Sequence, residues 1–510
     1  MTHTISDKLL AQSSEFITAR FGLHFPKKRW RDLEQGIICA ARDFGFADPA
    51  ACVRWLLTAE LTKEQINILA GCLTIGETYF FREQKSFEAL ENHILPELLG
   101  SRRGKEQRLR IWSAGCSTGE EPYSIGIMLQ RLIADLPHWN VTILATDVNP
   151  ASLRKGVQGE YGDWSFRGVP RGIKERYFTA GGTGRFAIAG AVRKMVTFAP
   201  LNLAEDTYPS LFNNTNAMDV IFCRNVLMYF SPEQAKRVID KFCHSLVAGG
   251  WLIVSPTETS PTLFAGFETV HFHNAVFYRK DGHGKTAVAP SLEATGAMTA
   301  PPPPLPAVDQ TGTMGFTPPQ SAEPLPAAAQ RDHAERQVSP YEEALALYRR
   351  GEYAEAAAKL VGFLANAPSG SASLRYGEAA ALLAWAFANQ GELSAALDWS
   401  EKAIAVNKLD PEVRYLQAII FQEQGDDDAA IASLKRALYL DHGFVLAHFA
   451  LANLTRRRGR TKEAARHLEN AASLLTAYGD NDILPGSEGM SARRLGEIIA
   501  STREASSGSL

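Results

Sequence analysis

The sequence predicts an α/β protein with a doubly wound, mainly parallel sheet, which follows a small helical domain and precedes a stack of helical repeats. Three observations lead to this fold class. Short apolar strands alternate with helical segments between about residues 105 and 280, which is typical of a parallel sheet. Before that region apolar residues recur at helical spacing. After it a glycine recurs at a fixed interval, which is typical of a repeat protein.

Length and composition exclude several classes of protein. The 510 residues correspond to roughly three domains. A net charge of −3 provides no basic field for nucleic acid. No apolar run approaches the ~20 residues of a membrane span, and the polar start "MTHTISDKLLAQSSEF" is unlike a signal peptide. Six cysteines without a CxxC pair predict neither a metal site nor a disulfide framework. We therefore expect a cytoplasmic protein without nucleic-acid partners or direct membrane insertion.

Residues 1–80 are predicted to form the helical domain. Ser6 is placed to cap a first helix, and Pro26 starts a second that ends at Gly45. A third helix opens at Asp48-Pro49. Thr62, with Gln65 three residues later, forms a capping box for a fourth.

Residues 81–280 carry the predicted sheet. Its strands are "RLRIWSAG", "VTILATDVN", "DVIFCRN" and "GWLIVSP". A helix is expected from Ser231-Pro232 to Gly249, with a capping box of Ser231 and Gln234 and a glycine stop. At about residues 157–198 short apolar runs between glycine turns predict a small antiparallel β insertion.

Residues 281–335 are rich in Pro and Ala and predict a linker. Residues 336–478 then show the tetratricopeptide period. Three glycines are spaced by 34 residues, and a fourth lies 40 residues before the first of them. An alanine stands five residues after each glycine and another seven residues before it. An unrelated helical bundle would not explain this fixed phase. Residues 479–510 are expected to form a C-terminal tail. The glycines are Gly351, Gly391, Gly425 and Gly459.

A glycine turn between a strand and a helix, "SAGCSTGEEP", is the strongest functional signal. It lacks the GxGxxG pattern and the Walker lysine, so a phosphate cradle is poorly supported. Glu120 and Glu121 add negative charge where a pyrophosphate would lie. A cationic, phosphate-free donor with ribose hydroxyls suits such a site, which favours S-adenosylmethionine.

The next strand ends at Asp147, 28 residues past Gly119, where a carboxylate can accept both ribose hydroxyls. Alternatively, Glu120 and Glu121 only favour the helix N-terminus and Asp147 only caps the next helix. Because these residues follow adjacent strands, together they favour an adenosine site.

Two further stretches stand at the expected ligand edge. In "GETYFFRE" at least one phenylalanine is expected in a core, and Arg82 needs an anionic partner, either a structural acid or a substrate carboxylate. "FCRNVLMYF" is a buried strand that ends in Arg224 and Asn225 and continues to Tyr229. The alternative for Tyr229 is a core tyrosine with a bonded hydroxyl.

Five motifs in order, "TYFFR", "WSAGCSTGEEPYS", "ATDVNP", "FAPLNL" and "IFCRNVLMYF", resemble the CheR-type chemoreceptor glutamate methyltransferases over about residues 5–280. Members with C-terminal tetratricopeptide repeats are a known architecture of that family. The resemblance implies an S-adenosylmethionine-dependent methyltransferase sheet. It implies cofactor contacts at Thr78, Arg82, Ala114, Glu120, Asp147, Asn202, Leu203, Arg224 and Asn225.

Arg82 and Tyr229 match the family residues beside the transferring methyl group. The sequence departs from the family at Gly76, often asparagine there, and at Ser255 to Glu258, where Gly-His-Ser-Glu is frequent. The implied reaction forms a methyl ester on a receptor glutamate in a chemosensory pathway. Such an acceptor is already ionised at neutral pH, so no strong base is needed.

The implied partner is the helical bundle of a chemoreceptor. The run "PKKRWRDLEQG" offers basic side chains for docking, although a solvated helix face is the ordinary reading of such a run. The repeats would recruit an unknown protein or peptide. Two alternatives remain open: a methyltransferase for another protein or a small molecule, and a scaffold whose catalytic part only senses the cofactor.

Overall fold

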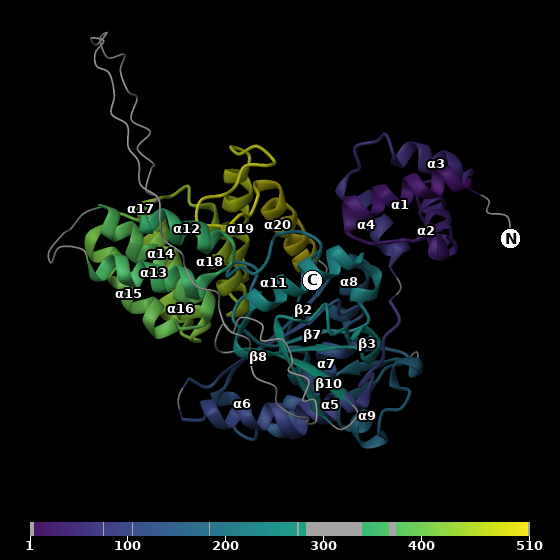
Figure 1. The fold of residues 1–510 in the computed structure, drawn as a ribbon, viewed down its shortest axis with the longest axis horizontal. Coiled ribbons are helices and arrows are strands. Elements are labelled where there is room, and N and C mark those ends of the chain that lie inside the picture. Colours follow the sequence, from purple (N-terminus) through teal and green to yellow (C-terminus); the bar gives the residue numbers. More distant parts are fainter. Residues whose placement is uncertain are drawn as a thin grey trace, which may run out of the picture. The chain divides into compact units, whose positions relative to one another are not determined.

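The computed structural model describes residues 5–74, 76–104, 106–182, 184–272, 275–281, 339–366 and 374–507 (Figure 1). The predicted linker therefore lies almost wholly outside the described residues. Within those ranges, no helix combines the length and the apolar character that crossing a bilayer requires.

Four helices form the N-terminal part, and the start signals predicted for the first, third and fourth of them are confirmed. Ser6 accepts a hydrogen bond from the backbone of the first helix, and Thr62 and Gln65 form the capping box of the fourth. The second helix begins at Trp30 rather than beside Pro26, because a 3₁₀ turn comes between them. The helices are α1 (Asp7–Phe21), α2 (Trp30–Asp43), α3 (Pro49–Leu56) and α4 (Lys63–Leu73), and the 3₁₀ turn is η1 (Lys27–Arg29).

A single disulfide joins Cys39 of α2 to Cys72 of α4, although the sequence indicates no disulfide framework. The two residues are 33 positions apart in sequence, so no local spacing pattern signals the bond. Packing of α2 against α4 brings them together. The other four cysteines are free.

A seven-stranded sheet forms the centre of the next part, in the order β6-β2-β1-β7-β8-β10-β9. The first five strands are parallel, whereas β10 runs antiparallel to both of its neighbours. The predicted mainly parallel α/β sheet is confirmed. Its strands are β1 (Arg108–Ala114), β2 (Asn140–Asp147), β6 (Val196–Pro200), β7 (Met218–Cys223), β8 (Leu246–Val254), β9 (Phe267–Phe272) and β10 (Ala275–Lys280).

Helices cover both faces of this sheet. One apolar core joins β1 and β7 to α5, α6 and α7, and a second joins the opposite face to α11. Helix α11 ends at Ser245, earlier than predicted, since Leu246 is already extended, and Gly249 lies inside β8 with φ +74° instead of ending the helix. Gln234 donates to the Ala204 carbonyl instead of completing a capping box. The helices are α5 (Gln84–Ala89), α6 (Leu95–Arg102), α7 (Glu120–Leu132), α8 (Pro150–Gln158) and α11 (Pro232–Ser245), with a π turn η2 (Leu90–Ile94).

The β insertion is confirmed as a three-stranded antiparallel sheet in the order β3-β5-β4. Phe80 is 1% exposed and stacks on Phe166 of the insertion, so one phenylalanine of "TYFFR" is a core residue as expected. The elements here are β3 (Glu160–Tyr161), β4 (Phe178–Ala180), β5 (Phe186–Ile188), α9 (Arg171–Tyr177) and α10 (Gly190–Arg193).

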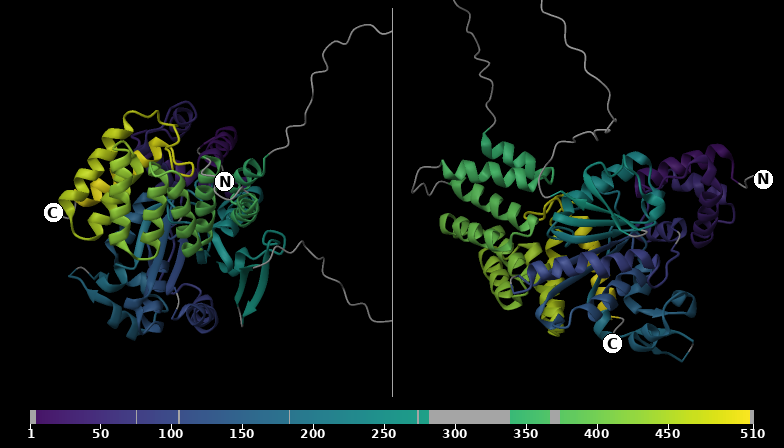
Figure 2. Two further views of the ribbon diagram at one scale, coloured as in Figure 1. Left: turned by 90° about the vertical axis from the view of Figure 1, so that its left-hand side faces the viewer. Right: turned by 60° about the horizontal axis from the view of Figure 1, so that its bottom comes forward.

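Eight helices form four hairpins that pack side by side (Figure 2). All four periodic glycines lie between the two helices of a hairpin with φ of +74° to +83°, a backbone region that favours glycine. The alanines five residues after and seven before them are at most 3% exposed, which confirms the tetratricopeptide pattern. The helices are α12 (Pro340–Arg349), α13 (Tyr353–Ala365), α14 (Leu374–Gln390), α15 (Leu393–Val406), α16 (Pro411–Glu423), α17 (Asp427–Leu440), α18 (Val445–Arg457) and α19 (Thr461–Leu475).

The segment expected to be a tail contains a further helix, α20 (Ala492–Ser507). Leu495 and Ile499 of α20 are buried in the same apolar cluster as the last hairpins. The helical region therefore continues past residue 478.

Candidate functional site

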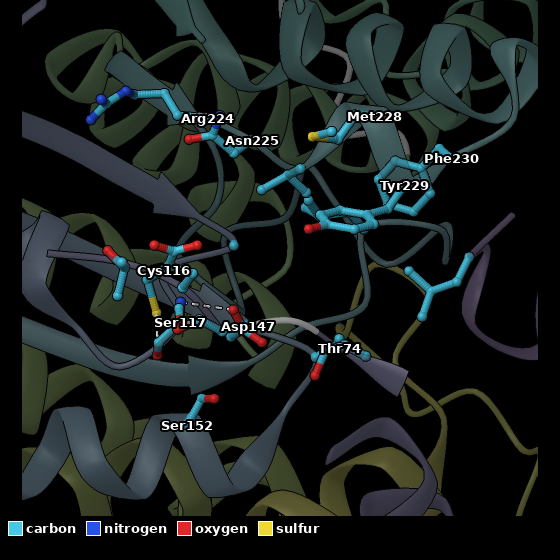
Figure 3. Close-up of a pocket in the computed structure, with 18 of the residues that line it drawn as sticks. Thr74, Cys116, Ser117, Asp147, Ser152, Arg224, Asn225, Met228, Tyr229 and Phe230 are labelled. Carbon is cyan, nitrogen blue, oxygen red and sulfur yellow. Dashed lines mark hydrogen bonds between the residues drawn. The ribbon is translucent and has the colours of Figure 1, made fainter. Parts of the chain in front are cut away.

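A cavity of about 370 Å³ lies at the carboxyl ends of β1, β2, β6 and β7, where ligands of doubly wound sheets bind (Figure 3). Its volume falls in the range of small-molecule sites. Side chains from α1 and α4 and the connection from residue 74 to 82 complete its walls.

The turn after β1 requires glycine at two positions. Gly115 has φ +80°, and a Cβ there would stand 2.4 Å from Cγ2 of Val226. Gly119 has φ +93°, and its Cβ would meet Phe198 at 2.9 Å. The turn therefore packs tightly on its neighbours while Ser117 and the start of α7 face the cavity.

Asp147 reaches the cavity from the end of β2 (Figure 3). Its carboxylate accepts the backbone N–H groups of Ser117 and Asn149, each at 2.8 Å. No cation pairs with it among the described residues. Burial raises the pKa of Asp147, and the backbone donors oppose that shift. These bonds fix a hydrogen-bond acceptor at the cavity wall.

Arg224 ties three parts of the site together. Its side chain is 2% exposed, and its guanidinium lies 3.0 Å from Glu121 and 3.1 Å from Glu83. It also donates to the carbonyl of Arg82. The end of β7, the first turn of α7 and the residue 74–82 connection are thereby held together.

This pairing corrects the charge argument made from the sequence. Glu121 is compensated by Arg224, and Glu120 turns to the hydroxyls of Thr118 and Ser165 at 2.6 and 3.0 Å. The two glutamates therefore do not form an uncompensated acidic rim. Among the described residues that line the cavity, Asp147 is the carboxylate without a cationic partner.

Asn225 is held in a left-handed conformation, φ +58°, by Glu258. The Glu258 carboxylate accepts the backbone N–H groups of Asn225, Met228 and Ser255 at 2.7 to 3.2 Å. Ser255 and Glu258 also form a capping box. The Ser255–Glu258 stretch, which departs from the family pattern, therefore makes a fully bonded turn.

Tyr229 and Arg82 face the same cavity. In Figure 3 the Tyr229 ring points into the open space, and its hydroxyl makes no hydrogen bond within the described residues. Burial raises the pKa of Tyr229, so the phenol stays a donor at neutral pH. Arg82 donates to the Glu77 carbonyl at 2.7 Å and forms no ion pair with a described carboxylate. Neither side chain has the structural partner that the alternatives required.

The cavity brings most predicted site residues together. Ala114 and Glu120 stand outside its lining, whereas Gly76 lies in it with its carbonyl bound to Ser117 Oγ at 3.2 Å. Sequence reasoning missed Ser117 and Met228, which carry no pattern of their own and reach the cavity only through the turn and the η5 helix (Leu227–Tyr229). The predicted residues in the lining are Thr78, Arg82, Asp147, Asn202, Leu203, Arg224, Asn225 and Tyr229.

The seven-stranded sheet with this cavity at its strand ends defines an S-adenosylmethionine-dependent methyltransferase. Residues 76–276 match the family described as "CheR methyltransferase, SAM binding domain". Chemotaxis protein methyltransferase 2 of Vibrio cholerae is 31% identical over 230 residues, 45% of this chain and 78% of the relative. Chemotaxis protein methyltransferase 1 of Pseudomonas aeruginosa is 36% identical over 218 residues, 42% of this chain and 77% of the relative.

The chain belongs to the CheR methyltransferase family, and S-adenosylmethionine is its cofactor. A crystal structure of MamA is weakly similar, with 20% identity, a TM-score of 0.25 and coverage of 27% of this chain and 77% of that one. Similarity at that level supports no inference about function.

Proposed function

We propose that the enzyme transfers a methyl group to a glutamate side chain of a chemoreceptor's helical bundle, in the cytoplasm, as part of a chemosensory pathway. The observation that carries this proposal is the pair of Arg82 and Tyr229, which face one cavity: Arg82 forms no ion pair with a described carboxylate, and the Tyr229 hydroxyl makes no hydrogen bond within the described residues. Together with the family membership, the pair suits an anionic acceptor beside a methyl donor.

The cavity's chemistry fits S-adenosylmethionine. Asp147 offers a fixed acceptor for ribose hydroxyls, and apolar side chains from α1 and α4 offer surface for an adenine ring. Glu120 does not line the cavity, so its effect on the cofactor would be indirect, through Thr118 and the first turn of α7. The residues that we assign to cofactor binding are Thr78, Arg82, Ala114, Glu120, Asp147, Asn202, Leu203, Arg224 and Asn225.

When bound, the cofactor supplies an electrophilic methyl group on a sulfonium. Arg82 would orient the acceptor carboxylate so that one of its oxygens faces that methyl group as the nucleophile. No proton has to leave, because the acceptor is ionised at neutral pH. Tyr229 would donate a hydrogen bond near the reacting atoms, and alignment of the acceptor would supply most of the rate. Arg82 must position the nucleophile without binding it so tightly that its reactivity falls.

The basic run before α2 is a candidate docking surface for acidic receptor helices. Lys27 and Lys28 are exposed, and the Arg29 guanidinium lies 5.0 Å from the Tyr229 ring centre, so the run adjoins the cavity. The fourth basic residue, Arg31, is exposed as well. Steering by these charges predicts that the methylation rate falls as salt rises; a flat response would argue against it.

We also propose that the repeats recruit a protein or peptide partner, as stacked helical hairpins commonly do.

The acceptor is tested with radioactive S-adenosylmethionine and receptor-containing membranes. A glutamyl ester releases its label as methanol in mild base, whereas an N-methyl product keeps it. Base-stable label would favour another acceptor class. Full pathway output from an Arg82→Ala variant would instead favour the scaffold reading.

A further inference from the structure

The connection between β6 and β7, residues 201–217, contacts both the cofactor cavity and the repeats. At its start Leu201, Asn202 and Leu203 line the cavity. Some eight residues later the same connection enters a face of the hairpin stack that is formed by the first helices of successive hairpins. One short segment therefore joins the two functional regions of the chain.

Two apolar side chains anchor the segment in the repeats. Leu211 is 5% exposed and packs in a cluster with Ala388 of α14 and Leu416 of α16. The ring of Phe212 stacks on Phe449 of α18, with ring centres 5.7 Å apart. Three consecutive hairpins thus contribute to holding two adjacent residues.

Glu488, from the loop before α20, holds the backbone of the segment. Its carboxylate accepts the Leu211 N–H at 3.0 Å and the Ser210 hydroxyl at 3.3 Å. Asn389 of α14 donates to the same carboxylate at 2.8 Å, and Tyr348 of α12 donates to it as well. This face of the repeats therefore bonds to polar groups of the segment as well as packing on its apolar side chains, and residues 211–214 form a turn against it.

The first residues of β1 extend this interface. Arg110 is 1% exposed, forms an ion pair with Glu423 of α16, and donates to Asn214 of the segment at 2.8 Å. Arg108 donates to the carbonyl of Gly391 at 3.3 Å. Buried arginines at the start of a central strand are unexpected in an isolated domain, and here Glu423 of the repeats supplies an acidic partner for both.

Contacts before and after residues 201–203 connect this part of the cavity wall to the residues that contact the repeats. Arg494 of α20 donates to the Pro200 carbonyl at 2.9 Å, directly before Leu201. On the other side the Tyr208 hydroxyl donates to the Leu203 carbonyl at 2.9 Å. Tyr208 itself packs against Trp112 and Phe242 in the core of the sheet. The repeat region therefore holds the backbone directly before residues 201–203, at Pro200, and reaches their other side through the connection that continues from Tyr208 to the docked Leu211 and Phe212.

We propose that this face of the repeats is an internal docking site for residues 208–216 and that this docking sets the cavity wall at Leu201–Leu203, so that cofactor affinity depends on it. A protein partner with a similar Leu-Phe peptide would have to displace the segment, and it would weaken cofactor binding when it did. The repeats would then be a regulatory part of the catalytic unit.

The test uses the full chain with a protease site inserted within residues 285–335. After cleavage, the two wild-type fragments should elute together and bind S-adenosylhomocysteine, measured by calorimetry, as tightly as the intact chain. In a Leu211→Ser/Phe212→Ser variant the fragments should separate, and the Kd should rise about fivefold or more, the lower range of coupling between sites. Tyr439→Ser, on an 81% exposed side chain of α17, is the control and should change neither result.

If the double variant fails to fold, as shown by loss of its far-UV circular dichroism, the Arg494→Ala variant tests the proposal instead. Its fragments should still elute together while the Kd rises, and Arg493→Ala on the same helix should leave the Kd unchanged. Separation of the cleaved wild type, or an unchanged Kd in both Arg494→Ala and the separated double variant, would overturn the proposal. Failure of the intact wild type to bind S-adenosylhomocysteine would instead contradict the cofactor site itself.

Discussion

The guanidinium of Arg224 and the carboxylate of Glu121 lie 3.0 Å apart and join the end of β7 to the first turn of α7. Glu83 completes the arrangement from the connection that carries Arg82. The cation is nearly unexposed and its two acidic partners are mostly covered, so the cluster is part of the cavity's framework.

Removing this cation should destabilise the fold. An Arg224→Ala variant leaves two carboxylates without their partner, and breaking a buried pair in this way costs about 3–5 kcal/mol. Urea denaturation measures the change. Arg167→Ala breaks a more exposed pair with Glu77 and should stay within about 1 kcal/mol. Equal effects of the two substitutions would contradict a framework role for Arg224.

Replacing the carboxylate of Asp147 should weaken cofactor binding. Asp147→Asn keeps the shape but loses the charge that accepts ribose hydroxyls, and a hydrogen bond to a charged group is worth about 1.5–3 kcal/mol. We expect the Kd for S-adenosylhomocysteine to rise by about 10- to 100-fold, as measured by calorimetry. An Asp163→Asn control, on the surface of the insertion, should bind normally.

The Tyr229 hydroxyl should contribute to turnover more than to folding. Because it makes no hydrogen bond within the described residues, Tyr229→Phe should leave the melting temperature unchanged. The kcat should fall about tenfold, which corresponds to the loss of one hydrogen bond. A stability loss with unchanged kcat would assign the residue to the core instead.

The sequence was most informative where local chemistry decides the structure. Ser6, Thr62 and the periodic glycines act through their own turns, and the structure confirms them. It was least informative where distant segments meet. The Cys39–Cys72 bond and the Arg224–Glu121 pair depend on packing between elements far apart in sequence, which no spacing pattern encodes.

The same limit applies to the interface of the repeats. The sequence predicts the helical repeats as a separate module on a linker, since nothing local marks Leu211 or Arg110 as contacts. The structure shows why β1 starts with two arginines: Glu423 lies across the interface from both. The expected uncompensated negative charge of Glu121 at the glycine turn is wrong for a related reason: Arg224, from another strand, compensates it.

A histidine pair should make the repeats sensitive to acid. Nδ1 of His448 lies 2.9 Å from Nδ1 of His467, and burial, then the neighbouring His448, lowers the pKa of His467 to about 4. The folded state therefore binds fewer protons than the unfolded state between about pH 6.5 and 4. Stability should be complete above that window and fall as pH drops through it. Denaturant titrations should show the slope, and His467→Gln should reduce it.

The central claim is that this cavity forms carboxyl methyl esters, and the most direct measurement is the rate of base-released radioactive methanol from receptor incubated with labelled cofactor. The wild type should produce it. At saturating cofactor, Arg82→Ala should lose about 100-fold or more of this rate through misorientation of the acceptor. Wild-type label that resists base, or equal rates for the two proteins, would contradict the claim.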